Sequence, residues 1–172
     1  MSADLPVELD VWKAVAGRRE YVGSLPLAGF TRLVDLVESE RAGVCRVGYR
    51  VGFDRDPLAG PFVELQVEAD LPLRCQRTLE VFVQAVRLHQ RLGLLIDEDA
   101  EAALPDGYEP VLVPASGLIA ARDLIEDELI LAVPVIPVGP DSAPIEVRFE
   151  PKAEEIAAAN PFAVLSSLKP KP

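Results

Sequence analysis

The stretch VELQVEADLPLRC at residues 63–75 decides the fold class. Every odd-numbered residue in it is apolar, and every even-numbered residue except Pro72 is polar or charged. Successive side chains of a β-strand point to opposite faces, so this alternation predicts a long strand with one buried face and one wet face. Pro72 cannot donate a ladder hydrogen bond and indicates an edge position or a bulge near the strand's end.

The residues that follow predict a return strand. Residues 76–78 form the expected turn, and the odd alternation resumes from Leu79. It changes phase near Ala85–Val86, which predicts a β-bulge in the second arm. We therefore expect one long hairpin over residues 62–92, with one face against a core.

Helical patterns lie on both sides of this hairpin in the sequence. Residues 121–133 carry an apolar stripe at helical spacing and form the main expected helix. Shorter helices are expected near residues 30–40 and, after the start signal Asn160–Pro161, at residues 161–168. The stripe of the main helix consists of Ala121, Leu124, Ile125, Leu129 and Ala132.

Together these elements predict the α+β class, with an antiparallel sheet built on the 62–92 hairpin and packed against the 121–133 helix. The length of 172 residues suits a single domain with a real core, so we expect one domain over residues 1–172. Acidic residues 97–107 are expected to form a loop, and residues 169–172 a flexible basic tail.

The charge of the chain is unevenly distributed. Hydrophobic residues make up 49% and charged residues 26%, which is typical of a folded protein, and the net charge is −11. Residues 97–128 hold ten acidic residues and only Arg122, a net charge of −9, whereas residues 1–96 and 129–172 each carry −1. This pattern excludes a broadly electropositive RNA-binding surface but leaves most of the chain close to neutral.

The sequence predicts a soluble cytoplasmic protein with free thiols. The first ten residues, MSADLPVELD, have neither a basic nor an apolar segment of the secretory kind. The longest apolar run, residues 129–138, is interrupted by two prolines and is about half the length that a membrane helix needs. In a reducing cytosol Cys45 and Cys75 are expected to stay unpaired.

The chain offers little for catalysis or metal binding. His89 is the only histidine, and no nucleophile or phosphate-binding motif occurs. Zinc sites usually require four Cys or His ligands, and the chain has three such residues in total. We predict no catalytic residue, no cofactor and no metal.

Two sets of charged residues have open interpretations. Arg74 and Arg77 flank the expected turn, and Arg87 and Arg91 lie on the return arm, with Arg87 expected opposite Gln66. The four arginines either form a basic strip that contacts phosphate or pair with neighbouring acids such as Glu64, Glu68 and Glu80. The second set, Glu126, Asp127 and Glu128 of the main helix, is either a solvated face or a docking surface for a basic partner.

Near the C-terminus, Phe162, Leu165 and Leu168 form an apolar stripe close to Lys169 and Lys171. This segment either docks on its own chain or binds a partner.

Four strings that occur in one order give the chain a family resemblance. They are LPLRCQRTLE at 71–80, ALPDGYEPV at 103–111, LIEDELILAVPVIPV at 124–138 and NPFAVLSSLK at 160–169. So arranged, they resemble the YceD family, the large ribosomal RNA subunit accumulation proteins of bacteria and plastids. The resemblance implies a non-enzymatic role in 23S rRNA accumulation and large-subunit assembly. It spans nearly the whole chain.

The chain departs from the family pattern at the hairpin turn. Many members carry Cys-x-x-Cys there and a His or Cys cluster after the proline-rich stretch. Here the first motif is Cys75-Gln76-Arg77-Thr78, and residues 138–143 contain neither His nor Cys. We therefore expect no zinc, and a turn that packing and hydrogen bonds hold instead.

Two hypotheses follow from the resemblance and the charge pattern. In the first, the protein binds 23S rRNA or pre-large-subunit particles through Arg74, Arg77 and the C-terminal lysines. In the second, it is an acidic interaction module that binds a basic large-subunit ribosomal protein without contacting RNA.

Overall fold

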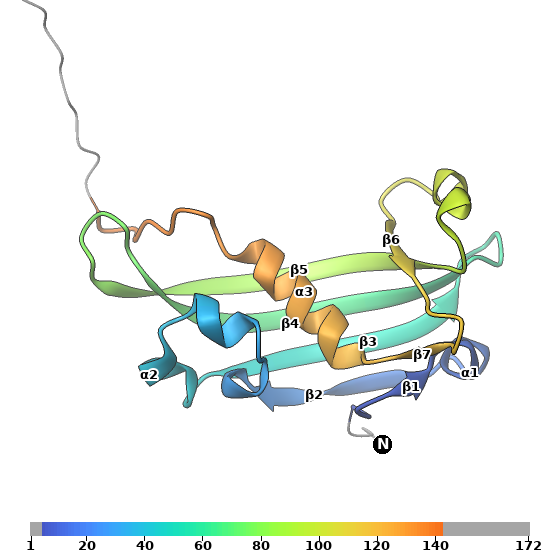
Figure 1. Cartoon of the computed structure of the whole chain (residues 1–172), viewed down its shortest axis with the longest axis horizontal. Coiled ribbons are helices and arrows are strands. Elements are labelled where there is room, and N and C mark those ends of the chain that lie inside the picture. The colour runs from blue at the N-terminus through green and yellow to red at the C-terminus, as the bar shows by residue number, and fades with distance from the viewer. Residues whose placement is uncertain (1–4, 143–172) are drawn as a thin grey trace, which may run out of the picture. The chain divides into compact units, whose positions relative to one another are not determined.

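The computed structural model describes residues 5–142, without the side chains of residues 39 and 40 (Figure 1). The chain divides into two units after Ser142, and the described residues all belong to the first unit. The expected helix at 161–168 and the basic tail at 169–172 lie outside the described residues. The single domain expected over residues 1–172 stays a prediction.

A five-stranded sheet dominates the described unit, in the order β2-β3-β4-β5-β6. Neighbours from β2 to β5 are antiparallel, whereas β6 runs parallel to β5. The α+β class is thus confirmed, but the sheet is mixed because the chain crosses over between β5 and β6. The strands are β2 Glu20–Pro26, β3 Arg46–Arg55, β4 Pro61–Arg74, β5 Val81–Leu95 and β6 Glu109–Leu112. A small second sheet pairs β1 (Leu9–Asp10) with β7 (Leu118–Ile119).

The pairing of β4 with β5 corrects three predictions. The register runs without interruption from Phe62↔Gly93 to Arg74↔Val81, so the expected bulge near Ala85–Val86 is absent. Val81, Val83 and Ala85 lie on the side of the sheet away from the core, whereas Val86 and Leu88 face the core, so the pattern changes face without a slip in register. The connecting loop also extends from Cys75 to Glu80, longer than the expected turn, and Arg87 therefore pairs with Glu68 rather than with Gln66.

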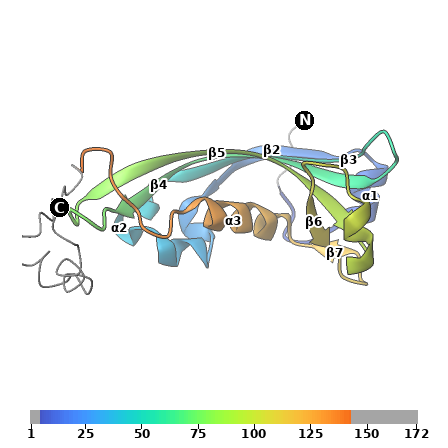
Figure 2. The same ribbon diagram turned by 90° about the horizontal axis from the view of Figure 1, so that it is seen from above.

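Within residues 5–142, helices cover one face of the sheet. Figure 2 shows α2 (Ser39–Ala42) and α3 (Ala121–Ala132) on the same side, and no helix of the described residues covers the opposite side. On the covered side, Leu65 and Leu71 of β4 are fully buried in one cluster with Ile125 and Leu129 of α3. Each such side chain contributes about 1.5–3 kcal/mol of hydrophobic stabilisation. The opposite side is called the open face below.

The helix expected near residues 30–40 is not continuous. The 3₁₀ helix η2 (Leu33–Leu36) and α2 replace it, and Val37 between them is extended. The backbone N–H of Glu38 donates to the carbonyl of Pro72, 2.8 Å away, at the end of β4 that extends beyond β3. A continuous helix would lose this contact with the sheet.

Three further helical elements complete the described unit. The short 3₁₀ helix η1 (Leu27–Gly29) follows β2. Helix α1 (Val11–Ala16) begins after Asp10, whose side chain accepts a hydrogen bond from the backbone N–H of Lys13. Where the sequence predicts an acidic loop, Asp97 caps the 3₁₀ helix η3 (Glu98–Ala103) in the same way. Among the described residues, no helix has the length and apolar character to cross a membrane.

Candidate functional site

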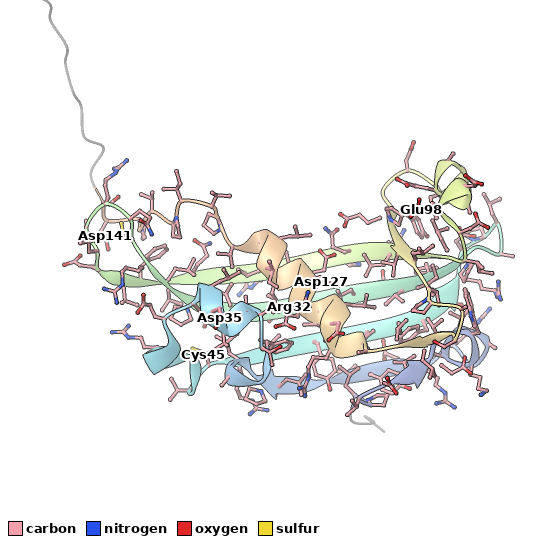
Figure 3. All side chains as sticks on the ribbon, in the orientation of Figure 1. Arg32, Asp35, Cys45, Glu98, Asp127 and Asp141 are labelled. Carbon is pink, nitrogen blue, oxygen red and sulfur yellow. The ribbon has the colours of Figure 1, made fainter. Side chains whose placement is uncertain are left out.

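Glu126 of α3 is a structural residue rather than a member of an exposed face. Its side chain is only 3% exposed. Its Oε1 accepts hydrogen bonds from the backbone N–H groups of Arg32 and Leu33, at 2.6 and 3.0 Å, where η2 begins. Figure 3 labels Arg32 beside Asp127, and the Arg32 guanidinium contacts Asp127 Oδ1 at 2.6 Å and Glu126 Oε2 at 3.3 Å. This cluster ties η2 to α3.

The hydrogen bonds also determine the charge state of Glu126. Burial by itself would raise the pKa of this carboxyl, but the N–H groups of Leu33 and Arg32 and the Arg32 guanidinium outweigh burial. The pKa therefore lies below its usual value. Glu126 remains ionised as the acceptor of two backbone donors that would otherwise have no helical partner.

Glu128 is the second buried acid of α3, at 7% exposed. Its carboxyl lies near Glu109 of β6, whose Oε1 accepts a hydrogen bond from Gln90 of β5 at 3.1 Å. Burial and the charge of Glu109 raise its pKa. The expected exposed face of three acids is therefore wrong, because only Asp127 is exposed and it already pairs with Arg32.

Hydrogen bonds and packing hold the β4–β5 loop, as the sequence predicted. The backbone N–H of Gln76 donates to the Pro137 carbonyl at 2.8 Å. The buried thiol of Cys75 accepts from Thr78 and from the backbone N–H of Gly139, and these bonds lower its pKa to about 6. Both cysteines are free. Within residues 5–142, no three His, Cys, Asp or Glu residues are grouped so that they could hold a metal ion.

The arginines beside this loop contact protein groups. Arg74 binds both carboxylate oxygens of Glu38 at 2.8 Å, and this lowers the pKa of Glu38. Arg77 donates to the carbonyl of Ser142 at 3.2 Å. Arg74 lies opposite Val81, six residues along β5 from Arg87, so the structure does not bring the loop arginines into one strip with Arg87 and Arg91.

Arg87 and Arg91 do share a surface, the open face. Their cross-strand partners on β4 are Glu68 and Glu64. Arg91 lies over the ring of Tyr108, 6.0 Å from its centroid, and 3.7 Å from Glu64. His89 lies between them on β5, with its Nε2 2.9 Å from the same carboxylate.

Two open-face arginines of β3 were not among the predicted site residues. Arg50 pairs with Glu20 at 2.6 Å, whereas Arg46 donates to the hydroxyl and carbonyl of Ser24 at 2.8 Å. The sequence could have identified them, because both are even-numbered in a strand whose odd-numbered residues are apolar. That alternation places them on the solvent-exposed face.

Arg46 and Arg87 reach the same depression on the open face. It has a volume of about 270 Å³. Gly48 leaves part of it without a side chain, since a Cβ there would meet only the Glu68 carbonyl oxygen, at 3.7 Å. The carboxylates of Glu68 and Asp70 also line it, so the depression is of mixed charge.

The remaining predicted site residues lie outside the described residues. They are Phe162, Leu165, Leu168, Lys169 and Lys171.

Comparison with known proteins identifies the family. The family model described as "Large ribosomal RNA subunit accumulation protein YceD" matches residues 63–169. A protein of that name from Haemophilus influenzae is 31% identical over 173 residues, which cover 97% of each chain. No solved structure matches the chain. By the family match and by this full-length similarity, the chain belongs to the YceD family.

Proposed function

We propose that this protein is a non-enzymatic cytoplasmic factor that supports 23S rRNA accumulation and the biogenesis of the large ribosomal subunit. Membership of the YceD family, whose name states this role, supports the proposal. The charge pattern agrees with it, because the acidic excess is confined to residues 97–128 and the sheet residues are close to neutral.

The protein acts by contacting the RNA of pre-large-subunit particles through its open face. The observation that carries this step is the depression that Arg46 and Arg87 line together. Guanidinium groups donate charge-assisted hydrogen bonds to phosphate oxygens. Within residues 5–142, the Arg87 side chain forms no hydrogen bond or ion pair, and Arg46 bonds only to neutral groups of Ser24. Both cations are therefore available to a phosphate.

The acidic row of β4 limits this interface to few phosphates. Glu64, Glu68 and Asp70 lie between the arginines of β3 and β5 and would repel a backbone that crosses them. We expect about two phosphate contacts, and hence a modest dependence of affinity on salt.

The alternative function, an acidic module that binds a basic ribosomal protein through α3 without contacting RNA, is less favoured. Glu126 and Glu128 are buried, and a partner could not reach them without opening the fold.

Filter binding of a 23S rRNA transcript to the full-length protein tests the RNA contact. The double variant Arg46→Ala/Arg87→Ala should bind at least about tenfold more weakly, and its salt slope should fall by about two. Arg41→Ala is the matched control, because it removes one exposed arginine from α2, on the covered side of the sheet. Equal binding by the native protein and the double variant would contradict this interface.

A gene deletion tests the wider role. Gradient profiles should show fewer large subunits and less 23S rRNA, and the native gene should restore both. Normal 23S rRNA levels in the deletion strain would exclude the proposed function.

A further inference from the structure

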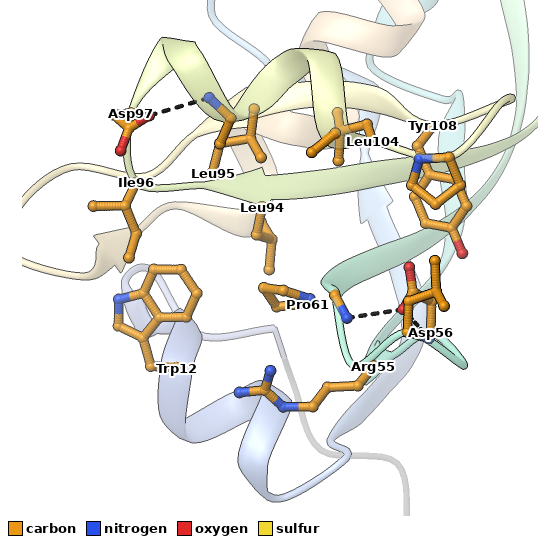
Figure 4. Close-up of a pocket in the computed structure, with 15 residues that line it drawn as sticks. Trp12, Arg55, Asp56, Pro61, Leu94, Leu95, Ile96, Asp97, Leu104 and Tyr108 are labelled. Atoms are coloured by element: carbon orange, nitrogen blue, oxygen red, sulfur yellow. Dashed lines mark hydrogen bonds between the residues drawn. The ribbon is translucent and has the colours of Figure 1, made fainter.

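An apolar pocket of about 570 Å³ lies between α1, the β3–β4 turn, the end of β5 and η3 (Figure 4). We call it the η3 pocket. Two large apolar side chains at the pocket are almost fully accessible to solvent, Leu58 at 83% and Ile96 at 76%. Exposed apolar groups that gather around a hollow are unusual on a surface with no partner. The apolar lining is formed mainly by Trp12, Leu58, Pro61, Ile96, Leu104 and Tyr108.

Close packing behind the pocket fixes its walls. Gly117 has a φ of +69°, and a Cβ at this position would lie 2.9 Å from Trp12 Cδ1. The indole therefore packs directly against the bare backbone. Leu104 packs in the same way against Gly93, where a Cβ would overlap its side chain. Tyr108 meets Phe62 edge to face at 5.6 Å. The pocket is preformed, which lowers the entropic cost of binding.

Asp56 and Asp97 line the η3 pocket, and the acidic segment 97–106 runs beside it. Residues 97–106 contain five acidic residues and no basic one. Asp97 caps η3, but Glu98, Asp99 and Glu101 on η3 are exposed. The carboxylate of Asp56 accepts from the N–H groups of its own turn, at Leu58 and Gly60.

Among residues 5–142, Arg55 is the one cation that lines the pocket. Its Nη1 donates to the Ala59 carbonyl at 2.7 Å. Asp56, Asp97 and the exposed acids of the adjoining η3 outnumber this arginine, so the surroundings of the pocket repel phosphate and attract lysine and arginine.

We propose that the η3 pocket is the docking site for a basic protein segment, which inserts a large apolar side chain between flanking lysines or arginines. The apolar walls supply the anchor, and the acids of η3 supply the complementary charge. This inference goes beyond the proposed function, since RNA contact through the open face requires no protein partner.

Trp12 makes the test specific, because it is the only tryptophan of the chain and it lines the pocket. The full-length protein is titrated with a synthetic peptide that carries Leu-Phe between two Lys-Arg-Lys blocks. Docking should shift the Trp12 emission to shorter wavelength in a saturable way. A peptide with Ser-Ser in place of Leu-Phe should bind at least about tenfold more weakly. Equal binding of both peptides would overturn the proposal.

Variants of the protein complete the test. Leu58→Ser/Ile96→Ser removes exposed side chains only, so it should fold normally and lose about tenfold or more in peptide affinity. Glu98→Gln/Asp99→Asn/Glu101→Gln should weaken binding mainly at low salt. Val44→Ser is the control and should bind the peptide as the native protein does. Val44 is 86% exposed and lies just before the first residue of β3, whereas the pocket lies at the last residues of that strand.

The outcomes also separate this inference from the proposed function. Arg46→Ala/Arg87→Ala should retain peptide binding while it loses RNA. Native affinity for the peptide in Leu58→Ser/Ile96→Ser would exclude the η3 pocket and leave the RNA contact unaffected. Loss of RNA binding in the same variant would show that the pocket takes RNA and would also contradict the inference.

Discussion

The acids of α3 and the acids of η3 belong to one acidic stretch of sequence but have opposite roles in the structure. Glu126 and Glu128 of α3 point inward and are buried against η2 and β5. Glu98 and Glu101 of η3 are exposed, whereas Asp97 and Ala100 of the same segment line the pocket. A count of charges treats both groups alike, whereas the physical effect of a carboxylate depends on whether protein donors already satisfy it.

This difference predicts opposite consequences for neutral substitutions in the two groups. Inside α3 they should change the free energy of unfolding, and on η3 they should change binding only. Four variants test this contrast.

Glu126→Ala should have the largest effect. It leaves the backbone N–H groups of Arg32 and Leu33 without an acceptor in a buried place, and we expect a loss of about 3 kcal/mol in the free energy of unfolding. Urea denaturation measures this. Glu126→Gln retains an acceptor oxygen and should lose clearly less. If Glu126→Ala lost less than about 0.5 kcal/mol in the free energy of unfolding, Glu126 would contribute no more to stability than the exposed acids of η3 do.

The stabilising role of Glu126 should also be visible in how the free energy of unfolding of the native protein depends on pH. The pKa of Glu126 is lower in the folded state than its ordinary value of 4.5. Its contribution to stability is therefore present above pH 4.5 and is lost as the pH falls through the folded-state pKa. Glu126→Gln should therefore lose less of its free energy of unfolding than the native protein does when the pH is lowered from neutral to acidic. Urea unfolding curves at the two pH values measure this.

Glu128→Gln should act in the opposite direction and be smaller. The folded state raises the pKa of Glu128, so its favourable contribution is present below pH 4.5 and is lost as the pH rises through the folded-state pKa. At pH 7 the amide removes a buried charge near Glu109, and we expect a gain of about 1 kcal/mol. This gain should disappear below pH 4.5, and thermal unfolding at both pH values would detect it. No gain at pH 7 would contradict the raised pKa.

The smallest effect should come from η3. Glu98→Gln/Asp99→Asn/Glu101→Gln changes three exposed side chains, and we expect the free energy of unfolding to stay within about 0.5 kcal/mol of the native value. The same urea titration measures it. A large loss would mean that η3 depends on these carboxylates for its structure.

Periodicity predicted the elements that bury a regular face. The odd residues of 63–73 are all buried in β4, and the apolar stripe of 121–133 contains the buried residues Ala121, Ile125 and Leu129. These elements were predictable because a strand or helix that covers a core must repeat its apolar residues at a fixed period.

The features that periodicity could not predict depend on contacts between residues far apart in the sequence. The break between η2 and α2 depends on a hydrogen bond from Glu38 to Pro72, and the burial of Glu126 depends on η2, more than 90 residues away in sequence. The η3 pocket was missed for the same reason. Trp12, Leu58 and Ile96 come from three separate elements, and no local pattern connects them.

The short parallel strand β6 has a consequence for the solubility of the protein. Within the described residues, β6 pairs only with Leu92–Leu95 of β5, so the long outer side of β5 before Leu92 has no strand beside it there. Such a backbone edge can recruit the same edge of another copy and start aggregation. Arg87 and Arg91 project from this stretch, and like charges on a second copy would oppose that pairing. Arg87, which is proposed to hold RNA, would thus also help to keep the free protein from self-association.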